Sequence, residues 1–136
     1  MRGLVVAVML VALALPAAGA LAQQRPVFEF GRKGGTRAAF TATIGADGVV
    51  SVTGGVRRLG PVTLTQPALA GLRKLASAEG FYSLPRNIKC PGPAGFATQF
   101  IHIRTATRDK YVQEYGGCRP GFSQLYDVLI AAAGLS

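Results

Sequence analysis

Apolar and polar residues alternate in several short stretches of the chain, and this period-2 pattern is typical of half-buried β-strands. Within residues 38–44, Phe40, Ala42 and Ile44 alternate with two threonines. The pattern predicts strands at 27–30, 38–44, 49–53, 97–105 and 110–115, with 62–64 as a candidate for a further short strand. The sequence GADG after Ile44 has the composition of a tight turn, so we expect the second and third strands to form a hairpin.

Two other stretches carry apolar residues at helical spacing. Residues 67–78 begin with a proline, place Leu69, Leu72 and Leu75 on one face, and are followed by Gly80. A second helix is predicted after Pro120, where the i, i+3, i+4, i+7, i+8 spacing is formed by Phe122, Leu125, Tyr126, Leu129 and Ile130. Together these elements predict an α+β fold of order β-β-β-α-β-β-α, with an antiparallel sheet of four to five strands and two helices packed on one face.

The N-terminus has the pattern of a cleaved signal peptide. Arg2 precedes an apolar run at 4–15, and Ala20 and Ala22 are the small residues expected before a cleavage site at Gln23. The run of about 12 residues is shorter than the roughly 20 that cross a bilayer as a helix, although a retained anchor is the alternative. We therefore expect a signal peptide at 1–22, a single α+β domain at 23–136, and an exported protein, periplasmic or secreted, without a transmembrane anchor after processing.

The chain is strongly basic, with 15 Lys and Arg residues against six Asp and Glu residues and a formal net charge of +9. Such a charge favours anionic partners, and most of the basic residues are Arg, which pairs well with carboxylate and phosphate. The basic residues are dispersed without a run of five or more, and aromatic residues are not interleaved with them. This distribution disfavours nucleic acid among the anionic partners.

Cys90 and Cys118 are the only cysteines. In an exported chain the pair predicts a disulfide, whose 29-residue loop stabilises the fold by about 3.5 kcal/mol in the loop-entropy description. The alternative, a metal or redox pair, lacks close spacing and histidine partners.

Few groups in the sequence are suited to catalysis. His102 is the only histidine, which excludes a histidine metal cluster and leaves one imidazole as a general base. Neither a GxSxG nucleophile elbow nor a GxxxxGK[ST] phosphate loop occurs. Glu29 and Glu114 lie on different predicted strands and stay open as a glycosidase-type pair. We expect a non-enzyme with no catalytic residue, no metal, no cofactor and no nucleotide.

The stretch GRKGGTR at 31–37 is the main candidate for binding. Its two adjacent glycines, Gly34 and Gly35, allow positive φ and hence a sharply bent hairpin connection. Such a connection would present Arg32, Lys33 and Arg37 outward, where they could hold an acidic partner. The alternative is a solvated loop whose charge only aids solubility. A second basic loop carries Arg57 and Arg58, which complete the candidate binding residues.

Several motifs resemble a known family. FEFGRKGG, LAGLRKLASAEGFYSLP, FATQFIHI with the following KYV, and PGFSQLYDVL are similar to the emfourin-like inhibitors of thermolysin-type metallopeptidases, and to related uncharacterised small secreted bacterial domains. The resemblance implies a strand that ends in a Gly-Gly loop, a helix, a hairpin and a final amphipathic helix. The chain departs from the inhibitors in its leader, its cysteine pair, the additional IGADGVVSVTGG hairpin and the absence of an acidic residue at 97–99. Of the inhibitory loop, only Gly34 and Gly35 match.

These observations favour a non-enzymatic exported binding domain, either a protein–protein interaction module or a peptidase-inhibitor-like one. The partner is then another protein, with a peptidase as one candidate. The alternative is a basic protein that associates with an anionic surface, such as lipid headgroups, polysaccharide or nucleic acid. A small hydrolase ranks last.

Overall fold

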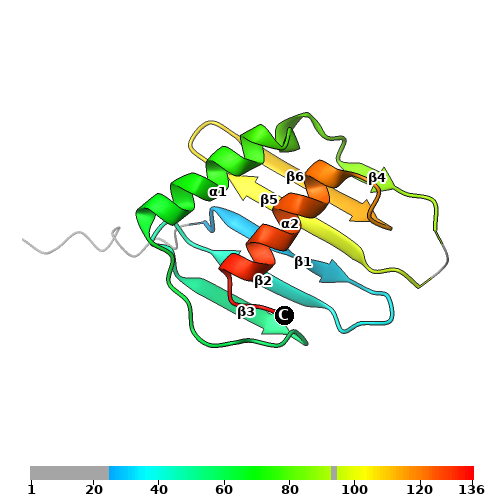
Figure 1. Cartoon of the computed structure of the whole chain (residues 1–136), viewed down its shortest axis with the longest axis horizontal. Helices are drawn as coiled ribbons and strands as arrows, with labels where there is room; N and C mark the ends of the chain where they lie inside the picture. The colour runs from blue at the N-terminus through cyan, green and yellow to red at the C-terminus, as the bar shows by residue number, and fades with distance from the viewer. Residues whose placement is uncertain (1–24, 93–94) are drawn as a thin grey trace, which may run out of the picture.

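The computed structural model describes residues 25–92 and 95–136, so the expected signal peptide at 1–22 lies outside the described residues. Figure 1 shows how the sheet and the helices of this part of the chain are arranged. The elements are β1 Phe28–Lys33, β2 Phe40–Ile44, β3 Val50–Gly54, α1 Gln66–Ala78, the short 3-10 helix η2 Phe81–Ser83, β4 Asn87–Lys89, β5 Thr98–Arg104, β6 Asp109–Tyr115 and α2 Pro120–Ala132. Within the described ranges, no helix is both long and apolar enough to cross a membrane.

The sheet is mixed and has six strands in the order β3-β2-β1-β5-β6-β4. β1 lies at the centre and pairs antiparallel with β2 on one side and with β5 on the other. β6 pairs antiparallel with β5 and parallel with β4. The α+β class is as the sequence predicts, but the expected antiparallel sheet of four to five strands is wrong in strand number, in element order and in the direction of β4.

The strand that the sequence pattern missed is β4. It has three residues, of which only Ile88 is buried, between an exposed asparagine and an exposed lysine. Three residues are too few to show a period, and pairing with β6 rather than local propensity makes them a strand. The candidate strand at 62–64 forms only an isolated bridge, between Val49 and Thr63.

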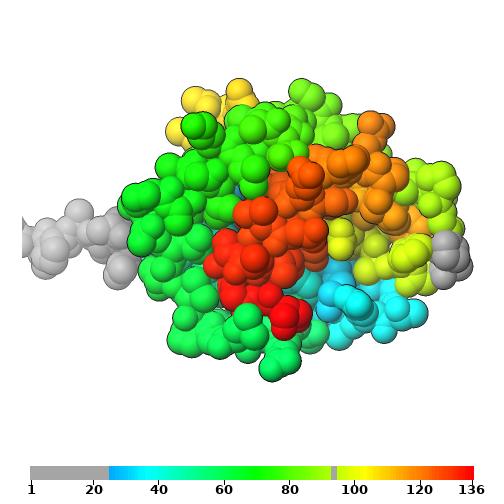
Figure 2. All heavy atoms as spheres, viewed as in Figure 1, coloured from blue at the N-terminus to red at the C-terminus, as the bar shows by residue number. Residues whose placement is uncertain are grey.

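Both helices cover the same face of the sheet, as Figures 1 and 2 show. Thr65 caps α1 by accepting a hydrogen bond from the Ala68 N–H, and Leu69 and Leu72 are buried beneath the helix. Gly80 ends this segment at a φ of 70°. The helix periods read from the sequence therefore correspond to the buried faces of α1 and α2.

The core lies between the sheet and these helices. Because side chains alternate along a strand, Phe28 and Phe30 of β1 point toward the helices and are fully buried. On α2, Phe122, Leu125 and Leu129 meet the sheet and are equally buried. The opposite face of the sheet, which we call the open face, is covered by neither helix (Figure 1).

Strand directions gather four connections at one end of the sheet, toward the right of Figure 1. β1, β3, β4 and β6 end there and β2 and β5 begin there, as their pairings require. We call this the loop end. It comprises the connections at 34–39, 55–58, 90–92 with 95–97, and 116–119.

Candidate functional site

Basic residues gather at the loop end. The strand ends and connections there contain Arg32, Lys33, Arg37, Arg57, Arg58, Lys89 and Arg119. None of the residues in the four connections is Asp or Glu. The fold thus brings together basic residues that are far apart in the sequence. This clustering of positive charge is the reason for treating the loop end as the candidate site.

The Gly-Gly pair turns the chain as expected. Gly34 and Gly35 have φ values of 63° and 80°, a region that side-chain-bearing residues rarely occupy. Gly35 also lies against the start of β5, because a Cβ added to it would stand 2.6 Å from the Ala97 nitrogen. The Thr36 N–H donates to the Gly95 oxygen at 3.2 Å, which ties the two connections together. The glycines therefore serve both the turn and the close approach of two loops.

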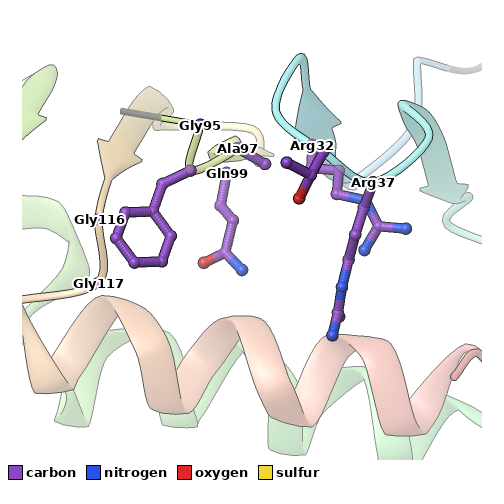
Figure 3. Close-up of a pocket in the computed structure, with 9 residues that line it drawn as sticks. Arg32, Arg37, Gly95, Ala97, Gln99, Gly116 and Gly117 are labelled. Atoms are coloured by element: carbon purple, nitrogen blue, oxygen red, sulfur yellow. The ribbon is translucent and has the colours of Figure 1, made fainter. Parts of the chain in front are cut away.

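A pocket of about 380 Å³ lies between these two connections and the link from β6 to α2 (Figure 3). Its lining combines cationic, amide and glycine residues, namely Arg32, Thr36, Arg37, Gly95, Phe96, Ala97, Gln99, Gly116 and Gly117. In Figure 3 the side chains of Arg37 and Gln99 extend toward α2. The pocket therefore opens at the loop end, and Arg32 and Arg37 add positive charge to a wall that is otherwise largely apolar.

Arg32 is held in place at this pocket. Its Nε donates to the Ala38 oxygen at 2.8 Å, and its guanidinium carbon lies 5.0 Å from the centroid of the Phe40 ring. The backbone bond uses one donor of the guanidinium group, which has five. The remaining donors belong to a side chain that is already ordered.

Lys33 lies on the other face of the sheet. Its Nζ donates to the Tyr111 hydroxyl at 2.7 Å and lies 4.9 Å from the centroid of the Phe100 ring. Lys33 is exposed but does not join Arg32 and Arg37 at the pocket, because adjacent residues of a strand point to opposite faces. Its ammonium group packs on the open face instead.

Arg57 and Arg58 belong to the loop end but do not line the pocket. Arg58 forms a bridge with Leu135, and the Ser136 N–H donates to the Arg57 oxygen at 3.0 Å. Their backbone therefore anchors the C-terminus beside the end of β3. They can add to the charge of the loop end without contacting a group in the pocket.

Phe96 is a site residue that the sequence pattern did not reveal. It lines the pocket, is 48% exposed, and meets the Tyr115 ring edge-on at a centroid distance of 6.3 Å. A single phenylalanine after glycine gives no periodic signal, so only its placement beside the arginines identifies it.

Tyr126 of α2 has a buried hydroxyl for which the described part of the chain provides no hydrogen-bond partner. Burial raises its pKa to about 12, against a smaller opposing effect of the Arg32 charge. The Tyr126 hydroxyl thus stays protonated at neutral pH.

The open face is tied together by polar side chains. The Tyr111 hydroxyl donates to Gln113 Oε1 at 3.0 Å, and Gln113 Nε2 donates to Asn87 Oδ1 at 2.7 Å. The Arg86 guanidinium group lies 4.8 Å from the Tyr111 ring centroid. These contacts link β4 to β6 on the open face.

The two carboxylates considered as a catalytic pair lie on opposite faces of the sheet. Glu29 lies on the open face and accepts from Arg104 at 3.2 Å, whereas Glu114 is buried beneath α2. The glycosidase-type arrangement is therefore wrong for this pair.

His102 lies on the open face and is hydrogen-bonded to Asp109, with 2.5 Å between Nε2 and Oδ1. The predicted strand at 110–115 begins one residue too late, because Asp109 is already part of β6 and pairs with Arg104. The hydrogen bond from His102 is the main cause that lowers the pKa of Asp109.

Replacing Asp109 with Asn tests this hydrogen bond through pH. A carboxyl whose folded pKa is lowered stabilises the fold above its unfolded pKa, and this contribution is lost as pH falls through the folded pKa. We expect wild type to be more stable than Asp109→Asn near neutral pH, and the gap to close below about pH 4. Chemical unfolding at several pH values measures the gap; a gap of constant size at every pH would contradict the assignment.

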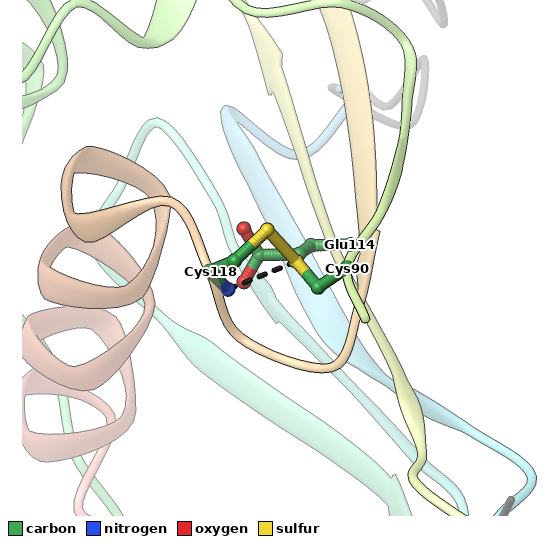
Figure 4. A group of neighbouring side chains, drawn as sticks. All are labelled: Cys90, Glu114 and Cys118. Atoms are coloured by element: carbon green, nitrogen blue, oxygen red, sulfur yellow. Dashed lines mark hydrogen bonds between the residues drawn. A yellow bond between two sulfur atoms is a disulfide. The ribbon is translucent and has the colours of Figure 1, made fainter. Parts of the chain in front are cut away.

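Cys90 and Cys118 form the predicted disulfide. Figure 4 shows Glu114 beside it. The Glu114 carboxylate accepts from the Arg119 N–H at 3.1 Å and from the Ser123 hydroxyl at 3.5 Å. The bridge therefore joins the end of β4 to the residue before the N-cap of α2, with a buried carboxyl group between them.

No protein-family model matches the chain, and no curated protein matches it. The functional proposals below are based on the geometry and chemistry of the described residues.

Proposed function

We propose that the chain is an exported, non-enzymatic binding domain whose loop end binds an acidic segment of another protein. The observation that supports this proposal best is the pocket between Arg32 and Arg37, in loops that contain no Asp or Glu. A ligand that approaches the loop end meets several cations with no loop carboxylate to neutralise them.

A carboxylate is the group that suits this pocket. A guanidinium group offers parallel N–H donors that match the two oxygens of a carboxylate. Arg32 is already ordered by the Ala38 oxygen and the Phe40 ring, so binding loses less side-chain entropy. Exposed Phe96 adds an apolar contact, and aromatic and Arg residues are common binding hot spots.

Export is part of the proposal. The leader pattern at 1–22 supports it, and so does the disulfide, because disulfides form and persist mainly in oxidising compartments. An acidic protein segment that the domain meets outside the cytoplasm is then the relevant ligand.

The resemblance to emfourin-like inhibitors suggests a particular partner, a thermolysin-type peptidase. The Gly34 and Gly35 turn is the element of that resemblance that lies at the loop end. Peptidase inhibition is tested by adding the purified domain to a thermolysin-type enzyme. If micromolar concentrations of the domain left the peptidase activity unchanged, a thermolysin-type peptidase would be excluded as the partner. The proposal that the loop end binds an acidic segment would then be decided by the next experiment.

Poly-L-glutamate is a defined probe for acidic polypeptide. We expect Arg32→Ala and Arg37→Ala each to weaken its binding about 10-fold, which corresponds to about 1.4 kcal/mol per charge-assisted contact. The matched control is the double variant Arg73→Ala with Arg108→Ala, which removes two arginines that do not line the pocket. Isothermal titration calorimetry measures the affinities at low and high salt.

The comparison between the two pocket variants, Arg32→Ala and Arg37→Ala, and the control double variant decides the proposal. Loss confined to the Arg32 and Arg37 variants supports a site at the loop end. Equal loss in the control, with equally tight binding to anionic vesicles or to heparin, would instead favour the alternative of a basic protein on anionic surfaces. No binding of poly-L-glutamate at low salt would overturn the proposal.

A further inference from the structure

Glu114 is the one charged residue in the described part of the chain that is buried, with 1% of its surface exposed. A buried carboxyl group is costly unless its partners compensate, and the Arg119 N–H and Ser123 hydroxyl do so only in part. A carboxyl oxygen, Cys90 Sγ and Cys118 Sγ all lie within 4.8 Å of one another. The buried acid therefore adjoins the disulfide, as Figure 4 shows.

The two sulfur-bearing residues differ in access. Cys90 is only 3% exposed, whereas Cys118 is exposed. In thiol–disulfide exchange a thiolate attacks the accessible sulfur and the other sulfur leaves. Attack at Cys118 would thus expel the buried Cys90 sulfur, beside Glu114.

The surroundings of Cys90 suit a leaving thiolate. The Cys118 N–H donates to Cys90 Sγ at 2.9 Å. The start of α2 at Pro120 follows directly, and the positive end of a helix dipole favours a thiolate nearby.

We propose that the Cys90–Cys118 disulfide is a thiol–disulfide exchange site that reacts with a dithiol at Cys118, and that Glu114 supplies the proton taken up by the departing Cys90 sulfur. In the first step a thiolate of the dithiol bonds to Cys118 Sγ and the Cys90–Cys118 bond breaks. Cys90 leaves with the electron pair and receives the Glu114 proton. In the second step the other thiol of the dithiol loses its proton to solvent and attacks the dithiol sulfur that is now bonded to Cys118 Sγ. Cys118 leaves as thiolate and is protonated from solvent, so the chain is reduced by two electrons and the dithiol is oxidised to a disulfide.

The electrostatics around Glu114 agree with a proton donor. Burial is the largest cause that raises its pKa, while the Arg119 N–H, the Ser123 hydroxyl and the Arg119 charge oppose the shift. Its register neighbours, Ile88 on β4 and Gln99 on β5, carry no charge. The carboxyl group therefore keeps its proton to a higher pH than an exposed glutamate does.

Reduction by dithiothreitol, followed by alkylation and mass spectrometry, tests the proposal. Relative to wild type, Glu114→Gln should be reduced at least about 10-fold more slowly per thiolate of the reductant. The wild-type rate per thiolate should also fall as pH rises through the Glu114 pKa, while the Glu114→Gln rate stays flat. Asp127→Asn is the matched control, since it removes an exposed carboxylate from α2, the helix that covers Glu114, and should leave the rate unchanged.

A second measurement needs no variant. Glutathione should form a mixed disulfide on Cys118 rather than on Cys90, as peptide mapping will show. Glutathione found mainly on Cys90, equal rates for wild type and Glu114→Gln at every pH, or a folded domain that resists millimolar dithiothreitol for hours would each overturn the exchange site.

Discussion

Replacing Phe30 with Ala is expected to lower the free energy of unfolding by about 3 to 5 kcal/mol. Phe30 lies on the central strand, is fully buried, and meets the Tyr126 ring edge-on with centroids 6.4 Å apart. The substitution leaves a cavity between the sheet and α2, and its neighbours are held by β2 and β5 on both sides. Denaturant unfolding at neutral pH measures the loss.

Phe96→Ala is the matched control for this prediction. It removes the same side chain from an exposed position, so its effect on unfolding should stay below about 1 kcal/mol. A loss of less than about 1 kcal/mol for Phe30→Ala would contradict the packing of α2 on β1.

Removing the disulfide, by changing both Cys90 and Cys118 to Ala, is expected to lower the free energy of unfolding by about 3.5 kcal/mol. The bridge closes a long loop that contains β5 and β6, so its loss mainly releases entropy in the unfolded chain. Equilibrium unfolding in guanidinium chloride gives the value.

Wild type unfolded in the presence of a reductant provides the comparison for the double variant. The free energy of unfolding should fall by a similar amount in the double variant and in reduced wild type, since both lack the same cross-link. If the double variant were as stable as oxidised wild type, the loop-entropy description would not hold for this fold.

Local patterns in the sequence account for most of the elements. Phe40, Ala42 and Ile44 alternate strictly, and the apolar residues of the two helices repeat at helical spacing, so each period identifies the face that becomes buried. The hairpins and helix ends follow from glycine and proline positions for the same local reason. These features depend on a few neighbouring residues and can be read without knowledge of the tertiary fold.

Strand number and strand order depend on contacts between residues that are distant in the sequence. Ile88 becomes part of a parallel strand only because β6 lies beside it. The insertion of β1 between β2 and β5 likewise joins Phe30 to Ile101 across a long stretch of chain. No local period encodes either pairing, so strand number and order were the parts of the fold that could not be predicted.

The candidate site has the same limitation at smaller scale. Arg32 and Lys33 are adjacent basic residues with no difference that a sequence pattern reveals. Because side chains alternate along a strand, Arg32 lines the pocket, whereas Lys33 contacts Tyr111 on the open face. Phe96 joins the arginines only through the meeting of two loops. The charge of the region was evident in the sequence, but its division between two faces was not.

The central position of β1 has a consequence for the order in which the chain folds. Translation delivers β1, β2 and β3 first, and they can pair at once, but the second edge of β1 lacks its partner until β5 has been made. Pairing across so long a separation is slow, because the intervening chain must close as a large loop. During that interval β1 has an apolar face and unpaired backbone groups that invite association with other chains. The yield of native protein should therefore depend on whether incomplete chains are prevented from associating with one another until β5 has been synthesised.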